Sequence, residues 1–261
     1  MRGVIEWHGF NSPSAKNLQV APPRSSLPGE MVANIRENIA RVEERIAAAC
    51  RRSGRRREDV RLVAVSKTHP PELIRAAFDA GVRDFGENRV QEAKSKLPAL
   101  ADLGATWHLV GHLQSNKARV ARELFHWVHS LDSLRLGEKL AQAAAPGGAR
   151  LPVLIEVNLG EEASKAGVGA GEVAALAERI APMETLELRG LMVIPPFVEN
   201  PEDVRPYFWQ LHALAAEIEK RNLPNVSMRE LSMGMSHDFE VAIEEGATIV
   251  RVGTAIFGER T

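Results

Sequence analysis

The chain has little of several features that mark whole classes of protein. It contains one cysteine, Cys50, in 261 residues, so it cannot form a disulfide within the chain. No apolar run approaches the ~20 residues that a membrane-spanning helix needs, and the N-terminus lacks the apolar core of a secretory signal. The formal net charge is −1, so no global field favours nucleic acid or an anionic membrane. We therefore expect a cytoplasmic protein with neither of those partners.

The N-terminal part divides into two stretches of different character. Residues 1–29 show no sustained hydrophobic period and are rich in proline, so we expect a poorly ordered extension or a misassigned start. Apolar residues then recur every three or four positions from Val32 to Ala49, which predicts a helix over residues 31–53, ended at Gly54. The basic cluster 51–57 could contact RNA, but it favours a solvated helix end.

From residue 60 onward, strand-like and helix-like segments alternate. The expected strands are Arg61–Ser66, Asp84–Gly86, Thr106–Val110, Trp127–Ser130, Val153–Asn158, Glu187–Ile194, Ser227–Ser232 and Ile249–Gly253. The expected helices between them are Pro71–Ala80, Arg89–Leu97, Ser115–Leu124, Ser133–Ala145, Gly171–Ile180, Pro201–Arg221 and Asp238–Glu245. Several strands are near-continuous apolar runs, which is typical of parallel sheets buried on both faces.

Eight such repeats predict the α/β class and a (β/α)8 barrel of the TIM type. No linker interrupts the pattern, so we expect a single domain over residues 30–261, including the N-terminal helix. A doubly wound open sheet is the alternative. It would place a glycine-rich phosphate turn after the first strand, where this chain has Ser66-Lys67-Thr68-His69 instead.

Lys67 ends the first expected strand, which is otherwise a run of small and β-branched residues. A lysine there either leaves the strand for solvent or is partly desolvated, which lowers the pKa of an amine and suits it to Schiff-base chemistry. In a barrel of this type, the strand ends and the loops that follow them form the active face. Other unusual polar residues follow the other expected strands, which favours a functional role for Lys67.

The loops after the last two expected strands are small and rich in hydroxyl groups. They are Leu231-Ser232-Met233-Gly234-Met235-Ser236 and Arg251-Val252-Gly253-Thr254. Phosphate sites in such barrels are often built from these two loops. Turn formation, or helix capping by Ser236 or Asp238, is the alternative explanation. Together with Lys67, the loops indicate a ligand that has both an aldehyde and a phosphate, and pyridoxal 5′-phosphate (PLP) is such a ligand.

Six motifs in this chain resemble those of the pyridoxal phosphate homeostasis proteins (YggS/PROSC type). They are Val63–Thr68, Phe85–Asn88, Trp107–Lys117, Ser164–Gly167, Leu231–Ser236 and Arg251–Gly258, and the resemblance covers about residues 31–259. It implies the fold-type III PLP-binding barrel of alanine racemase with an extra N-terminal helix.

The resemblance also implies roles for individual residues. Lys67 would carry PLP as a Schiff base, and Arg251 would face the pyridine nitrogen. Asn88 would lie near the ring. Phosphate contacts would come from Ser232, Gly253 and Thr254, with Ser236 and Gly234 nearby. Lys165 matches a second lysine near the family's pocket and would be a transient acceptor of the cofactor; a flexible loop charge is the alternative.

The resemblance implies a non-catalytic carrier of PLP that hands the cofactor to apo-enzymes. An arginine at the pyridine nitrogen disfavours protonation of the ring and so weakens it as an electron sink. A two-base racemase of this fold would also use a tyrosine from a partner subunit and a covering C-terminal domain. This chain has one tyrosine, Tyr207, and ends just after the eighth strand. We expect an open site and a monomer.

The competing class is an enzyme, either a PLP-dependent amino-acid racemase or a Schiff-base lysine aldolase. An aldolase would need an acid–base pair near Lys67, for which Glu87 and His108 are candidates. His108 and His112 are four residues apart, but they lie on a strand and its following loop and lack the HExxH pattern, so we predict no metal site.

Overall fold

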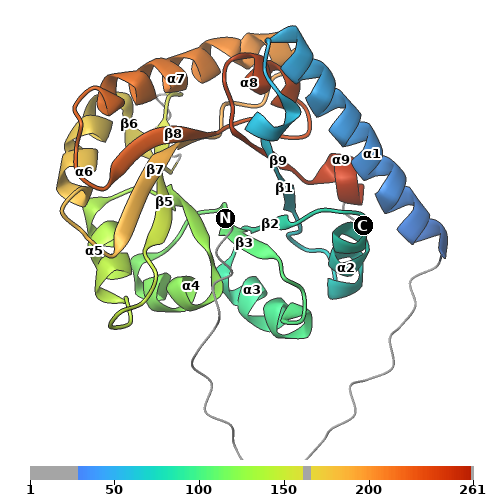
Figure 1. The fold of residues 1–261 in the computed structure, drawn as a ribbon, viewed down its shortest axis with the longest axis horizontal. Helices are drawn as coiled ribbons and strands as arrows, with labels where there is room; N and C mark the ends of the chain where they lie inside the picture. Colours follow the sequence, from blue (N-terminus) through green and yellow to red (C-terminus); the bar gives the residue numbers. More distant parts are fainter. Residues whose placement is uncertain (1–28, 161–165, 260–261) are drawn as a thin grey trace, which may run out of the picture.

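Eight parallel strands close into a barrel at the centre of the molecule (Figure 1). The computed structural model describes residues 29–160 and 166–259. The strands follow the order β4-β3-β2-β1-β9-β8-β7-β5, and β4 also pairs with β5. This last pairing closes the ring, so the (β/α)8 prediction is confirmed and the open-sheet alternative is excluded.

The elements alternate regularly along the chain. The barrel strands are β1 Arg61–Val65, β2 Asp84–Glu87, β3 Thr106–Leu109, β4 Trp127–Leu131, β5 Leu151–Asn158, β7 Leu186–Val193, β8 Val226–Ser232 and β9 Ile249–Val252. The helices are α1 Gly29–Arg52, α2 Pro71–Asp79, α3 Val90–Lys96, α4 Ala118–Leu124, α5 Leu134–Gln142, α6 Val173–Ile180, α7 Arg205–Glu219, α8 Phe239–Glu244 and α9 Thr254–Phe257. Every barrel strand matches an expected one to within two residues at each end.

Three details differ from the sequence prediction. A two-residue strand, β6 Val168–Gly169, pairs with β5 outside the ring and was not predicted, because two residues carry no period. The 3-10 turns Ser115–Lys117, Ala170–Glu172 and Pro201–Val204 begin three of the expected helices. The short helix α9 lies where we expected only a loop, since one turn is too short for a helical pattern.

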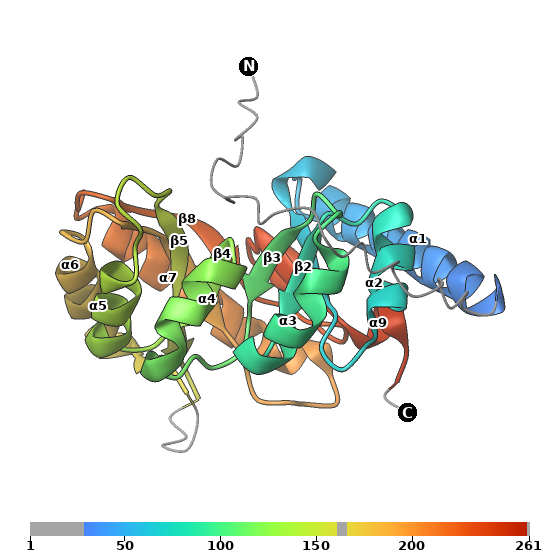
Figure 2. The same cartoon turned by 90° about the horizontal axis from the view of Figure 1, so that it is seen from below.

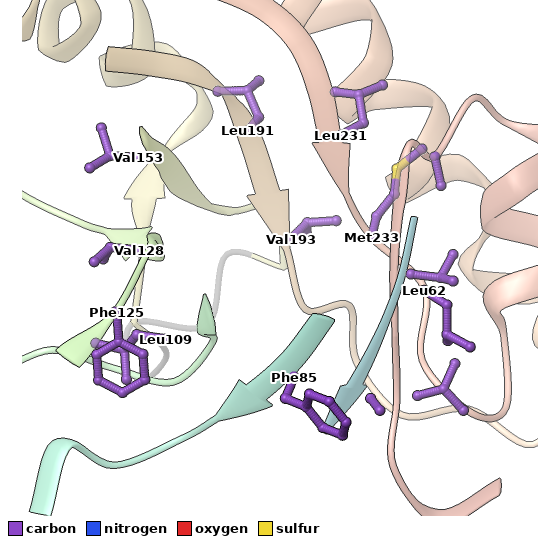
Figure 3. Packing of buried hydrophobic residues seen from close by; sticks show 14 of the residues in the cluster. Leu62, Phe85, Leu109, Phe125, Val128, Val153, Leu191, Val193, Leu231 and Met233 are labelled. Carbon is purple, nitrogen blue, oxygen red and sulfur yellow. The ribbon is translucent and has the colours of Figure 1, made fainter. Parts of the chain in front are cut away.

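Successive side chains along each strand point alternately out of the barrel and into it, which gives two layers of side chains. One set packs outward against the helices, and Figure 3 labels several of its members, such as Leu62, Phe85 and Leu191. A smaller apolar cluster, made of Val63, Leu154, Met192 and Ile249, has the opposite phase to these neighbours and fills the inside of the barrel. The inside also contains polar side chains, which the next subsections describe.

Helix α1 covers one side of the barrel. It packs against α2, α8 and α9, and both views show it running along the outside of these elements (Figures 1 and 2). The predicted stripe faces the core, with Ile35 and Ile46 among its buried members. The helix ends at Arg52, just before Gly54 with φ +68°. No helix in the described residues is long and apolar enough to cross a membrane. Of the predicted extension, residues 1–28 lie outside the described residues, and Gly29 is the first residue of α1.

Candidate functional site

A cavity of about 230 Å³ opens at the carboxyl-terminal ends of the barrel strands. Segments that follow β1, β2, β8 and β9 contribute to its lining, although they are far apart in the sequence. Six of the residues that the sequence singled out line it: Lys67, Asn88, Ser236, Arg251, Gly253 and Thr254. The barrel therefore brings the expected amine, the hydroxyl groups and the cation to one place.

The backbone just before Lys67 is held by a buried polar cluster. Ser66 is fully buried, and its hydroxyl donates to Glu87 Oε1 at 2.6 Å. Lys96 Nζ donates to the Ser66 carbonyl at 3.0 Å and to the same Glu87 oxygen at 2.8 Å. Burial raises the pKa of Glu87, while Lys96 and Ser66 oppose that shift. These bonds hold the backbone from which the Lys67 side chain extends.

The residue after Lys67 is held as well. Thr68 has φ +67°, a left-handed conformation that a β-branched residue rarely adopts. Its N–H donates to the Glu92 carboxylate, which also accepts from Lys96 Nζ at 2.8 Å. Unusual backbone of this kind persists only where the surroundings enforce it, and it gathers at ligand sites. The left-handed turn and the Ser66 cluster together fix the direction in which the lysine enters the cavity.

Elsewhere in the lining, on the segments that follow β8 and β9, backbone donors converge on Ser236. Its Oγ accepts from Gly253 N and from Ala255 N, each at 3.3 Å. These bonds tie Ser236 to the start of α9, which follows another strand, and Ser236 does not cap α8, the helix that follows it in the chain. Asp238 forms no side-chain cap on α8 and instead accepts from the Met235 N–H. Ser236 in the segment after β8 and Thr254 at the start of α9 line the same cavity, and hydroxyl groups beside backbone donors suit an anionic group.

Arg251 supplies a buried cation to the cavity. Its side chain points along the inside of β9 and donates to the Ser232 carbonyl at 2.6 Å, to Ser232 Oγ at 2.7 Å and to the Val193 carbonyl at 2.9 Å. Burial lowers its pKa to about 10, and the charges of Asp238 and Glu156 oppose that shift. Arg251 is therefore charged at neutral pH and held in one orientation.

Two predicted site residues, Ser232 and Gly234, are not among the residues that line the cavity. Ser232 is fully buried and absent from the lining, because its hydroxyl contacts Arg251 and lies 2.9 Å from His129 Nδ1. Gly234 has φ +91° and also lies outside the lining, although its carbonyl accepts from Arg251 N. Their contacts with a phosphate stay predictions. Lys165 falls outside the described residues.

Sequence reasoning missed His129 and gave His108 another role. Both are fully buried inside the barrel, where His108 Nδ1 lies 3.0 Å from His129 Nε2 and His108 Nε2 lies 2.9 Å from Asp84 Oδ1. The sequence did contain one signal for this arrangement. Each histidine stands at a strand position whose side chain points into the barrel, as the alternation of side chains along a strand predicts. The two residues are far apart in the sequence, so no local motif joins them.

These histidines predict a pH dependence of stability. Burial lowers the pKa of His108 and, more strongly, of His129. The unfolded chain takes up these protons near pH 6.5, whereas the folded protein resists them. The histidine contribution to the unfolding free energy is therefore complete above pH 6.5 and falls below it. The expected loss is about 1.4 kcal/mol per pH unit for each histidine.

Urea unfolding from about pH 7.5 to about pH 5.5 checks this prediction. Burial raises the pKa of Glu87, Glu156 and Asp238, which acts in the opposite direction at the acid end. The comparison is therefore between the wild type and His129→Gln, which share those carboxyls. The variant should lose stability less steeply with falling pH. Equal slopes would contradict the prediction.

The comparisons with known proteins agree with this geometry. A family model described as "Alanine racemase, N-terminal domain" matches residues 32–261. The pyridoxal phosphate homeostasis protein of Aquifex aeolicus is 48% identical over 227 residues, which cover 87% of this chain and 99% of that protein. The chain belongs to the pyridoxal phosphate homeostasis protein family.

Two solved structures resemble this chain to different degrees. PipY of Synechococcus elongatus, solved with PLP bound, is 42% identical, with a TM-score of 0.75 over 86% of this chain and all of PipY. Alanine racemase of Corynebacterium glutamicum has a TM-score of 0.67 at 16% identity, over 88% of this chain and 62% of that enzyme. The second likeness shows the fold alone, which confirms the predicted alanine racemase-like barrel.

Proposed function

We propose that this chain binds PLP at the mouth of its barrel, attaches it reversibly through Lys67 and passes it to other proteins without catalysing a reaction of its own. The observation that carries the proposal is the presence of Lys67, Arg251, Ser236 and Thr254 around one cavity. Membership of a family whose curated relatives are named pyridoxal phosphate homeostasis protein supports the same role.

The chemistry of the cavity fits PLP. When bound, PLP supplies an aldehyde for a primary amine and a phosphate for hydrogen-bond donors. Lys67 would supply the amine. Ser236, Gly253 and Thr254 would hold the phosphate, Arg251 would face the pyridine nitrogen and Asn88 would lie beside the ring. Lys165, in the segment outside the described residues, would act as a transient acceptor during release.

A carrier role accounts for the site better than a catalytic role does. Arg251 is charged at neutral pH, and a cation beside the pyridine nitrogen disfavours its protonation. The ring is then a weak electron sink, which disfavours chemistry on a bound amino acid. Tyr207, the one tyrosine of the chain, lies half-buried on α7 and is not among the described residues that line the cavity, so it does not supply the second base that a two-base racemase of this fold would use.

The aldolase alternative has less support still. Glu87 is fully buried against Ser66 and Lys96, and His108 is fully buried between His129 and Asp84. Neither side chain belongs to the lining of the cavity. The acid–base pair that an aldolase would need beside Lys67 is thus engaged elsewhere. We further propose the cytoplasm as the place of action, consistent with one buried, unpaired cysteine.

The test is to load the purified protein with PLP and follow its absorbance, then add an apo-enzyme that needs PLP and measure its activation. We expect a yellow protein and transfer of the cofactor. Lys165→Ala should slow transfer without preventing attachment. Racemisation or decarboxylation of amino acids at about 1 s⁻¹ or faster would overturn the carrier role. A protein that stays colourless with PLP would favour the aldolase. The recipient enzymes and the monomeric state stay predictions.

A further inference from the structure

A row of polar side chains crosses the inside of the barrel, where such barrels usually hold layers of branched aliphatic residues. Its members are Asp84, His108, His129, Ser232 and Arg251, from β2, β3, β4, β8 and β9. Four of them are buried, and the side chain of Asp84 retains 22% exposure. Asp84 begins β2, at the end of the barrel away from the cavity, and Arg251 lines the cavity.

The contacts between these groups are continuous. Asp84 Oδ1 lies 2.9 Å from His108 Nε2, and His108 Nδ1 lies 3.0 Å from His129 Nε2. His129 Nδ1 lies 2.9 Å from Ser232 Oγ, and Ser232 Oγ lies 2.7 Å from Arg251 Nη1. All four distances are those of good hydrogen bonds. Both ring nitrogens of each histidine are therefore used.

The chemistry of the two ends fixes the direction of every bond. A carboxylate oxygen accepts, so His108 Nε2 carries a proton and donates to Asp84. A neutral His108 then has a bare Nδ1, which accepts from His129 Nε2–H. A neutral His129 likewise has a bare Nδ1, which accepts the Ser232 hydroxyl proton. The Ser232 oxygen is then free to accept from Arg251, which can only donate.

Neutral histidines are what their surroundings favour. Burial lowers the pKa of both rings. His108 faces Asp84, which raises its pKa, while Arg61 and His126 lower it further. His129 faces His108, Arg251 and Arg61, all of which lower its pKa. A second proton on His129 would have to lie beside the fixed charge of Arg251.

We propose that Asp84, His108, His129 and Ser232 form a one-directional hydrogen-bond chain that positions the Arg251 guanidinium at the cavity. This inference deepens the proposed function, on which the role of Arg251 toward the PLP ring rests. It makes Ser232 a positioning residue, because its hydroxyl lies between His129 and Arg251 and has no open side toward the cavity. The orientation of the cation is then set from the opposite end of the barrel.

The direct test needs no ligand. Full-length protein with 15N-labelled histidine is studied by long-range ¹H–15N correlation at about pH 7.5, above the ordinary histidine pKa. We expect a proton on Nε2 and a bare Nδ1 in both His108 and His129, assigned with His108→Gln and His129→Gln. A proton on Nδ1 of either ring, or a doubly protonated ring, would overturn the proposed direction.

The second test asks whether the hydrogen-bond chain affects the release of PLP from the cavity. Ser232→Ala removes an acceptor from Arg251, so release of PLP should become about tenfold faster, as for the loss of a hydrogen bond to a charged group. The Nδ1 signal of His129 should shift in the same variant. Ser232→Thr, which keeps the hydroxyl, should restore both properties.

A matched control is Ser130→Ala, because Ser130 is equally buried on β4 and donates to the Gly111 carbonyl at 2.7 Å, outside the chain. Its release rate and its histidine signals should match those of the wild type. Wild-type release from Ser232→Ala would overturn the proposal. If the wild type takes up no PLP, the proposed function fails, and the histidine spectrum alone then decides the hydrogen-bond chain.

Discussion

Lys67→Ala should abolish covalent attachment of PLP. Lys67 brings a primary amine to a cavity that Arg251, Ser236 and Thr254 also line. Its neighbours on both sides are fixed by the Ser66 cluster and by the left-handed Thr68. No other lysine among the described residues lines this cavity. We therefore expect loss of the stable adduct, since no other described residue of the lining carries a primary amine.

The measurement is borohydride reduction of the PLP-loaded protein, followed by mass spectrometry of its peptides. The wild type should carry one adduct, on Lys67. A matched control is Lys117→Ala, because Lys117 lines a neighbouring cavity at the same end of the barrel. That variant should keep the full adduct. An adduct of wild-type amount in Lys67→Ala would refute the assignment of the anchor.

Gly234→Ala is expected to lower the unfolding free energy by about 3 kcal/mol. Gly234 has φ +91°, where a side chain costs roughly 1–2 kcal/mol. A Cβ there would also lie 2.6 Å from Ala242 Cβ and 2.8 Å from Phe239 Cα, and overpacking of this kind costs about 1–3 kcal/mol. The contacts are with a helix backbone and a methyl group, which cannot swing aside.

Urea denaturation gives this difference as a shift in midpoint at an unchanged slope. The control is Gly104→Ala, because a Cβ added at Gly104 would meet no atom within 4 Å and the residue has no positive φ. It should change stability by less than about 0.5 kcal/mol. Equal stability of the two variants would show that the loop after β8 can yield. A loop that adapts in this way would also hold Ser236 less firmly in position.

The outline of the site follows from the sequence because barrel topology converts strand ends into neighbours. Lys67 follows β1 directly, while Gly253 and Thr254 follow β9, and parallel strands carry their carboxyl ends to one face. To predict that these residues lie together, only the number of strands and their order had to be correct. The loop residues Ser236 and Asn88 were placed at the cavity by the same argument.

The position of Ser232 shows where that argument stops. A serine at the end of β8 can face the cavity or lie beneath it, and the choice depends on the stagger between neighbouring strands. The structure puts Ser232 below the lining, against Arg251 and His129. The second serine of the same motif, Ser236, lies in the lining, although the two belong to one short run of residues.

By itself the sequence determined the elements, their order and the face on which the chemistry lies, because these depend on local periodicity and on the topology of parallel strands. Only the tertiary structure decided which polar groups meet inside the barrel. His129 and Ser232 are 103 positions apart in the chain. Their contact arises from the closure of the ring and the stagger of its strands, neither of which leaves a local pattern.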